Sequence, residues 1–138
     1  EALEVEHQAR KCLTPKDAVV VDLLGAIYVT SDPILTAYLY LDDHPSSTAP
    51  ALKGEPVLVD ATKDPVAAPK VEEVKKCIGA ALPPYQVPKQ YLLANWIPRT
   101  ASNKTDRKKL HAVGEKYNQE RLAREGDNPH QPVPQTVN

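Results

Sequence analysis

Two nearly unbroken apolar segments with a short turn signal between them constrain this chain most. Residues 18–30 are rich in β-branched side chains, and residues 34–41 are almost as apolar. Continuous runs of this kind predict strands that are buried in a sheet. The connection between them, Ser31-Asp32-Pro33, is a turn signal and is too short for a crossover helix. The two strands are therefore expected to be antiparallel neighbours.

Two other segments have the spacing of amphipathic helices. Residues 2–13 place apolar side chains three to four positions apart, with acids early and bases late, which complements the helix dipole. Residues 70–82 carry a second apolar stripe, and Pro83-Pro84 follows it. Residues 89–97 predict a third strand.

A third helix is expected to begin at about Asp106, which is a good N-cap residue, with its buried side marked by Leu110, Val113 and Tyr117. After Arg124 the composition becomes rich in proline and loses all apolar periodicity. We therefore expect one domain over residues 1–125 and a linker or tail over residues 126–138.

This order of elements indicates a small α+β domain. A three-stranded sheet is expected to have helices packed against it, followed by the C-terminal helix and a flexible, proline-containing tail. Residues 57–59 are a candidate for one further short strand inside a long surface loop.

The bulk composition excludes several classes of protein. The chain has 138 residues and a formal net charge of −1, which argues against a strongly basic nucleic-acid binder. No stretch approaches the roughly 18 apolar residues of a membrane span, and the acidic N-terminus is not a signal peptide. We therefore expect no membrane partner and a cytoplasmic location. Because the sequence does not start with Met, we also expect a fragment of a longer protein.

The two cysteines, Cys12 and Cys77, have no metal-binding spacing and fall on the apolar faces of the first two helices. Buried free thiols are the expectation, and a disulfide is the alternative. Free thiols would suit a reducing cytosol.

Most catalytic motifs are missing from the sequence. There is neither a P-loop nor a dinucleotide-binding pattern, and five glycines are too few for a glycine-rich phosphate cradle. The four histidines lie far apart and lack ligand spacing, so no metal site is expected. No serine has the G-x-S-x-G context, which argues against a self-contained hydrolase.

One region is unusually basic. Residues 89–109 contain six basic side chains and one acid. Lys104 lies there in a short polar turn, just before the expected third helix. A lysine on such a turn presents a compact charge on a flexible stem, and it can reach into a partner's cleft and neutralise a phosphate. Charge by itself favours a solvated basic face.

Three segments, in the same order, resemble the C-terminal subdomain of the adenylate-forming superfamily, which includes adenylation domains of nonribosomal peptide synthetases, acyl-CoA synthetases and luciferases. Residues 4–8 resemble the acidic helix start just past the hinge of adenylation domains. Residues 82–88 resemble their L-P-x-Y-M-V-P stretch, with Gln86 in the Met position. Residues 98–107 resemble the final signature, in which Pro and Thr precede G-K-x-D-R.

The match has one departure and one further likeness. Asn103 stands where the signature has glycine, and Asn is the non-glycine residue that best tolerates a positive φ. The long charged helix over residues 108–124 is similar to what fungal peptide synthetases carry.

The resemblance implies a reaction in two halves. A carboxylate attacks the α-phosphate of ATP to give an acyl-adenylate, and the phosphopantetheine thiol of a carrier protein then takes the acyl group. Lys104 would be the catalytic residue of the first half. Thr100, Asn103, Asp106 and Arg107 would support its turn and the helix start. No residue of this chain is expected to bind a cofactor, because ATP and Mg would be held mainly by an N-terminal subdomain.

The partners implied by the resemblance are the N-terminal adenylation subdomain, a carrier (thiolation) domain and an amino-acid substrate. The chain is expected to be a monomer and to be inactive alone. Residues 126–138 would lead toward the carrier domain, or would be an unstructured tail. Two alternatives stay open: an acyl-CoA synthetase, and a non-catalytic interaction module whose basic turn binds an acidic partner.

Overall fold

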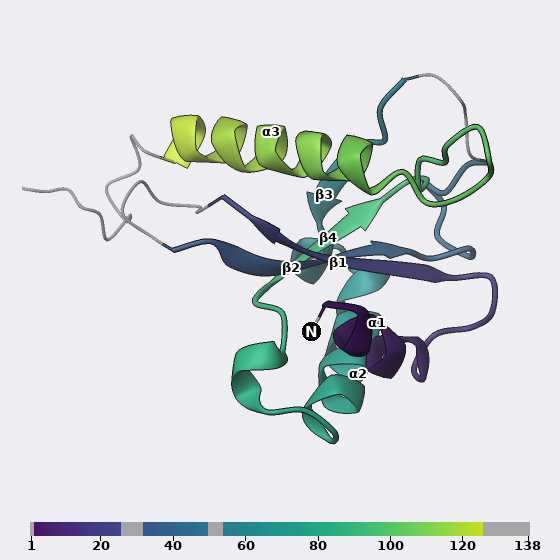
Figure 1. The fold of residues 1–138 in the computed structure, drawn as a ribbon, viewed down its shortest axis with the longest axis vertical. Coiled ribbons are helices and arrows are strands. Elements are labelled where there is room, and N and C mark those ends of the chain that lie inside the picture. The colour runs from purple at the N-terminus through teal and green to yellow at the C-terminus, as the bar shows by residue number, and fades with distance from the viewer. Residues whose placement is uncertain (1, 26–31, 50–53, 126–138) are drawn as a thin grey trace, which may run out of the picture.

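The computed structural model describes residues 2–25, 32–49 and 54–125, which contain three α-helices, four strands and two single-turn 3-10 helices, Ala61–Lys63 and Pro84–Gln86. The α+β class expected from the sequence is confirmed (Figure 1). In chain order the elements are α1 (Ala2–Arg10), β1 (Ala18–Leu24), β2 (Ile34–Tyr40), β3 (Leu58–Asp60), α2 (Ala67–Gly79), β4 (Gln90–Ala94) and α3 (Arg107–Glu125).

The strands form one mixed sheet in the order β1-β2-β4-β3. β1 and β2 are antiparallel, as expected, with Ala18 opposite Tyr40 and Leu24 opposite Ile34. β4 runs parallel to β2, and β3 runs antiparallel to β4. The sheet therefore has four strands rather than three, because the short segment around Leu58 pairs with the outer edge of β4.

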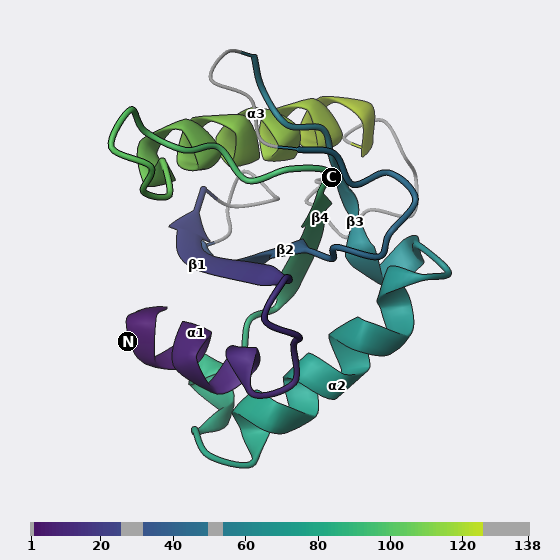
Figure 2. The same cartoon turned by 90° about the vertical axis from the view of Figure 1, so that its right-hand side faces the viewer.

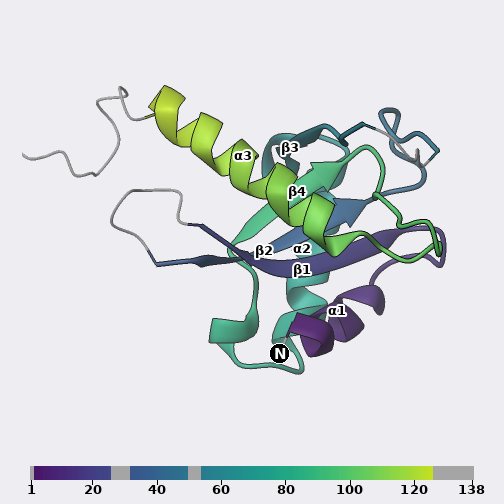
Figure 3. The same cartoon turned by 45° about the horizontal axis from the view of Figure 1, so that its top comes forward.

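The helices cover both faces of this sheet. α1 and α2 lie on one face and α3 lies across the other (Figures 1, 2 and 3). The buried side chains accordingly form two clusters, one around Leu39, Val74 and Ile78 and the other around Tyr38, Leu92 and Leu110. Strands covered on both faces read as continuous apolar runs, which explains the unbroken segments of the sequence.

The boundaries of several elements differ from those predicted. α2 begins three residues earlier than expected, because the Asp64 carboxylate accepts hydrogen bonds from the backbone N–H groups of Val66 (3.1 Å) and Ala67 (2.8 Å). β1 ends at Leu24. The rest of its predicted range, and the predicted linker over residues 126–138, lie outside the described residues.

The prediction of free thiols is wrong, because Cys12 and Cys77 form a disulfide with their Cα atoms 6.3 Å apart. Cys12 follows the end of α1 and Cys77 lies on α2, and both helices pack on the same face of the sheet. That shared packing brings together two residues that are 65 positions apart in the sequence. The argument from free thiols to a reducing cytosol therefore no longer holds.

The carboxylate of Glu6 joins both sides of the sheet. Its side chain is fully buried, and it lies at the outer edge of β1, where the backbone N–H of Val21 donates to it at 2.8 Å. The Arg107 guanidinium at the start of α3 donates to both of its oxygens, at 2.8 and 2.9 Å. Arg10 adds a longer contact of 3.2 Å from within α1. One side chain thus holds α1, β1 and α3 together.

The contacts of Glu6 also decide its ionisation. Burial by itself raises the pKa of the carboxyl group, whereas the hydrogen bonds from Arg107 and Val21 and the charges of Arg107 and Arg10 lower it. The lowering effects are larger in sum, so the pKa of Glu6 lies below its ordinary value of 4.5. The group is ionised at neutral pH, which is the state that its three donors require.

A carboxyl group whose pKa is depressed by folding stabilises the fold above its unfolded pKa, and this contribution is lost as the pH falls through the folded pKa. We expect Glu6→Gln to lower the free energy of unfolding at neutral pH by about 2 kcal/mol. Between about pH 5 and pH 3 the variant should lose less stability than the parent chain. Urea unfolding over this pH range measures both effects.

The matched control is Glu4→Gln, which removes an exposed carboxylate from the same helix. It should leave the pH dependence of stability as in the parent chain. Equal pH dependence in the parent chain and in Glu6→Gln would contradict the role of this group.

The contact between α3 and the sheet leaves no room for a side chain at Gly114. A Cβ atom there would fall on the Tyr38 hydroxyl and would lie 2.9 Å from the Leu24 Cδ1 atom. We expect Gly114→Ala to destabilise the fold by about 1–3 kcal/mol, as overpacking does. Gly79, at the end of α2, has no neighbour within 4 Å of the corresponding position, so Gly79→Ala should not destabilise.

Thermal unfolding of both variants checks this prediction. Adding Tyr38→Phe to Gly114→Ala removes the atom that clashes and should restore part of the loss. A Gly114→Ala chain as stable as the parent would show that α3 does not approach the sheet this closely.

Candidate active site

Residues 98–106 form a closed turn between β4 and α3. Three backbone hydrogen bonds close it: Thr100 N–H to Lys104 O at 2.7 Å, Asn103 N–H to Thr100 O at 2.8 Å, and Asp106 N–H to Pro98 O at 2.8 Å. Arg99 and Thr105 also pair as an isolated antiparallel bridge. Because these bonds lie within the turn, its shape does not depend on a partner molecule.

Asn103 allows this turn to close without a glycine. It has a φ of 65°, the left-handed conformation, and among the described residues no other non-glycine residue has a positive φ. Asn adopts this conformation more readily than most side chains do. The residue that departs from the family signature therefore adopts the backbone geometry for which glycine is usually needed.

Lys104 projects from the tip of the turn into solvent. Its backbone N–H donates to the Thr100 hydroxyl at 3.2 Å, and its residue is exposed. Within the described ranges, the ammonium group makes neither an ion pair nor a hydrogen bond. A charge with no internal partner is available to an anion brought by another molecule.

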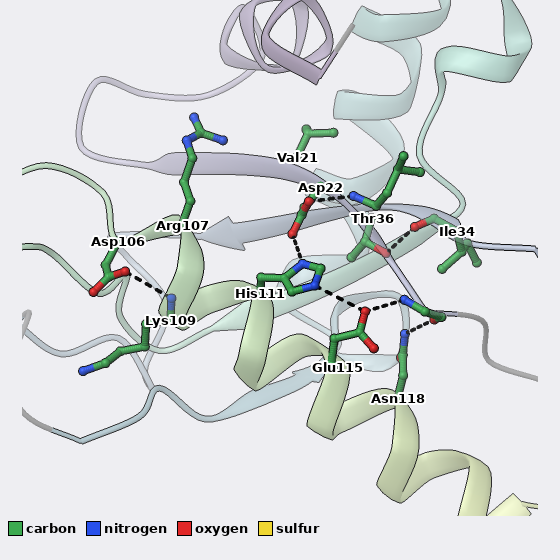
Figure 4. A network of polar contacts seen from close by, with 12 residues as sticks. Val21, Asp22, Ile34, Thr36, Asp106, Arg107, Lys109, His111, Glu115 and Asn118 are labelled. Atoms are coloured by element: carbon green, nitrogen blue, oxygen red, sulfur yellow. Dashed lines mark hydrogen bonds and ion pairs between the residues drawn. The ribbon is translucent and has the colours of Figure 1, made fainter.

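The end of the turn is fixed to the start of α3. The Asp106 carboxylate accepts a hydrogen bond from the Lys109 N–H at 3.1 Å, which is the N-cap contact expected from the sequence (Figure 4). Arg107 is held by Glu6. The structure thus brings together all five of the predicted site residues: Thr100, Asn103, Lys104, Asp106 and Arg107.

The predicted basic region is not one continuous patch. Lys89 precedes β4, whereas the turn follows β4, so the length of the strand separates them. The Lys109 ammonium donates to the Gly54 carbonyl at 3.1 Å, and the Arg99 guanidinium donates to the Asn103 carbonyl at 3.4 Å. Two of the neighbouring cations therefore bind backbone carbonyls, one of them inside the turn.

Sequence reasoning did not single out Glu6 as part of this site. A signal for it was present: Glu6 lies four residues after Ala2 and three before Ala9, on the buried face of α1. A carboxylate at helical spacing on an apolar face requires a cationic partner. Which cation that would be is not visible in the sequence, since Arg107 is 101 residues away.

A second polar network joins α3 to β1. The His111 ring lies between two carboxylates, with Asp22 at 2.6 Å from Nδ1 and Glu115 at 3.4 Å from Nε2 (Figure 4). Glu115 also accepts the Gly25 N–H at 2.6 Å. These groups hold the middle of α3 on the edge strand, away from the turn that carries Lys104.

The side chains of His44, Ser46 and Asp64 form a chain of contacts that resembles a hydrolytic triad in composition. His44 lies 2.8 Å from Asp64 and 2.9 Å from the Ser46 hydroxyl. The Ser46 backbone N–H, however, donates to the same ring nitrogen at 3.0 Å, and the Asp64 carboxylate also accepts the Ala67 N–H at the start of α2. The hydrogen bond from His44 is the largest of the effects that hold the pKa of Asp64 below its ordinary value. The cluster fixes a surface loop to the start of α2.

Two negative findings apply to the described part of the chain. It contains no group of three His, Cys, Asp or Glu side chains that could hold a metal ion. None of its helices is long and apolar enough to cross a membrane.

Comparison with known proteins gives two kinds of match. No family model matches the chain. The nonribosomal peptide synthetase dtxS1 of Metarhizium robertsii is 32% identical over 120 residues, which cover 87% of this chain and 1% of that protein. The peramine synthetase ppzA of Metarhizium majus is also 32% identical, over 87% of this chain and 4% of that protein. The chain thus spans a small part of the curated relatives it matches.

The fold also has solved counterparts. The structure of the ATP-bound RpMatB-BxBclM chimera B3 matches with a TM-score of 0.53 over 85% of this chain and 18% of that chain, at 12% identity. Likeness at this identity shows a shared fold. By sequence the chain is thus similar to a short part of fungal nonribosomal peptide synthetases, and by fold it is similar to part of the RpMatB-BxBclM chimera.

Proposed function

We propose that this chain is the mobile C-terminal subdomain of a peptide-synthetase adenylation domain, and that Lys104 supplies the cation for aminoacyl-adenylate formation. The observation that carries the proposal is an exposed lysine on a turn that closes by its own hydrogen bonds, with no partner for its ammonium group among the residues that the structure describes. The similarity to fungal peptide synthetases supports an amino acid as the substrate and favours this reading over an acyl-CoA synthetase.

The chemistry of the first half-reaction needs such a cation. The amino-acid carboxylate must approach the α-phosphate of ATP, and both groups are anions. A positioned ammonium offsets their repulsion and the charge that develops on the transferred phosphoryl group. Lys104 would donate hydrogen bonds to oxygens of both reactants as the new bond to phosphorus forms and the bond to pyrophosphate breaks.

The remaining contacts to the reactants belong, in this proposal, to the N-terminal subdomain. The described residues hold no metal-binding cluster, so we assign Mg²⁺ and most ATP contacts to that partner. The isolated chain, acting as a monomer, would then have no adenylation activity.

Placing the lysine on a separate subdomain makes adenylate formation conditional on closure. Rotation of the subdomain would withdraw Lys104 after the first half-reaction. The acyl group would then pass to the phosphopantetheine thiol of a carrier domain, toward which residues 126–138 would lead.

In the synthetase that carries this chain, Lys104→Ala should lower the rate of ATP–pyrophosphate exchange by about 10²-fold or more, because a positioned charge is lost from the transition state. Thioester formation from aminoacyl-adenylate that is supplied ready-made should keep its rate. Lys76→Ala, an exposed lysine on α2, is the control and should leave both rates unchanged. Exchange at the parent rate in Lys104→Ala would refute the proposal.

The turn geometry gives a separate prediction for Asn103. Asn103→Gly should keep exchange within about threefold of the parent rate, since glycine readily adopts a positive φ. Asn103→Val should lower the exchange rate by about 5- to 30-fold, because a β-branched residue is strained by about 1–2 kcal/mol in this conformation. Similar rates for the glycine and valine variants would show that the turn conformation has no bearing on adenylate formation.

A further inference from the structure

The turn that carries Lys104 is anchored unequally to the rest of the fold. On the β4 side, Trp96 and Ile97 are buried directly before the turn. On the α3 side, the first fully buried side chain is Leu110, which lies six residues after Lys104. Between them, Arg107 provides a polar attachment one helical turn from Lys104.

This attachment is a bidentate ion pair between the start of α3 and a carboxylate of α1. The Arg107 guanidinium makes two parallel hydrogen bonds, of 2.8 and 2.9 Å, to the two oxygens of Glu6. A bidentate contact fixes the direction of the guanidinium plane as well as its distance. Glu6 itself cannot move freely, because it is buried and bound to the Val21 N–H of β1 at 2.8 Å.

We infer that Glu6 and Arg107 are positioning residues for Lys104. The pair holds the first turn of α3 against α1 and β1, and thereby sets where the lysine tip lies when the subdomain closes. Neither side chain is expected to touch the reactants. The inference rests on the function proposed above, since it assigns these residues a role in the same half-reaction.

The expected loss of rate follows from how sensitive a reaction is to the position of a catalytic group. A misplacement of about 1 Å in a catalytic group can lower a rate by about 10²-fold. Arg107 lies three residues from Lys104, so weakening its contact with Glu6 would change the position of the turn directly. It would leave the substrate contacts of the N-terminal subdomain intact.

The pair also makes α1 and the turn move as one body. Residues 4–8 of α1 resemble the segment just past the hinge of adenylation domains, so in the proposed function α1 lies next to that hinge. When the subdomain rotates at the hinge, α1 and the turn that carries Lys104 would then move together as one rigid body.

Arg107→Lys is the informative substitution, because lysine keeps the charge but cannot form the bidentate fork. In the synthetase that carries this chain, it should lower kcat for adenylate formation by about tenfold or more. KM for ATP and for the amino acid should stay within about twofold, as should thioester formation from supplied adenylate.

The matched control is Arg10→Lys. Arg10 also contacts Glu6, but through a single atom at 3.2 Å and from α1, which does not carry the turn. We expect parent rates in both half-reactions. Equal losses in Arg10→Lys and Arg107→Lys would overturn the inference, because the effect would then not depend on the bidentate contact at the start of α3.

A second measurement is independent of activity. In the 138-residue chain, Arg107→Lys should accelerate amide hydrogen exchange at Asn103, Asp106 and Lys109 by about tenfold or more, while the amides of α2 keep their protection. Unchanged exchange at the turn would overturn the inference. A uniform acceleration across α2 and α3 would also overturn it, since it would show loss of global stability.

The two proposals fail in different ways. If Lys104→Ala leaves adenylate formation intact, the proposed function is wrong, whatever the exchange data show. If Lys104→Ala abolishes adenylate formation and Arg107→Lys leaves kcat and turn exchange unchanged, the function stands and the positioning role is wrong.

Discussion

The buried carboxylate of Glu6 needs hydrogen-bond donors and a positive charge beside it, and the packing of α1, β1 and α3 provides them. An isolated charge removed from water is very costly, so its partners must be in place when the chain folds. Those partners are the Val21 N–H of the edge strand and the Arg107 guanidinium at the start of α3. Removing the Glu6 charge is expected to cost about 2 kcal/mol, against a typical total stability of about 5–15 kcal/mol. The arrangement of α1, β1 and α3 therefore depends on this one contact more than on any single apolar pair.

The same contact fixes one end of the candidate site to the domain and leaves the lysine at the other end exposed. Arg107 and Asp106 are bound to the domain, whereas Lys104 has no partner for its ammonium within the described residues. The proposed function requires this combination, because an ammonium group that is already paired within the domain would be less available to a phosphate. The shape of the turn comes from its own backbone hydrogen bonds and from the left-handed conformation of Asn103, so it does not depend on a partner molecule.

Prediction from the sequence succeeded where the pattern was local or repeated. The two long apolar runs gave antiparallel neighbours, and Asp106 was recognised as a helix cap from its residue type and position. The prediction from the sequence was weaker for β3, because a strand of three residues in a proline-rich loop is too short to show a periodic pattern. The free-thiol expectation failed because helical periodicity shows that Cys12 and Cys77 each face a core, but not that they face the same one.

The sequence by itself determined the continuous features of this protein: the buried strands, the cap at Asp106, and a turn in which Asn103 precedes Lys104. Each depends on residues within a few positions, whose backbone preferences are nearly independent of the rest of the chain. Only the tertiary structure decided the contacts between distant segments, namely Glu6 with Arg107, Cys12 with Cys77, and Tyr38 against Gly114. Such contacts depend on how the helices cross the sheet, and that path is set by all the packed side chains together.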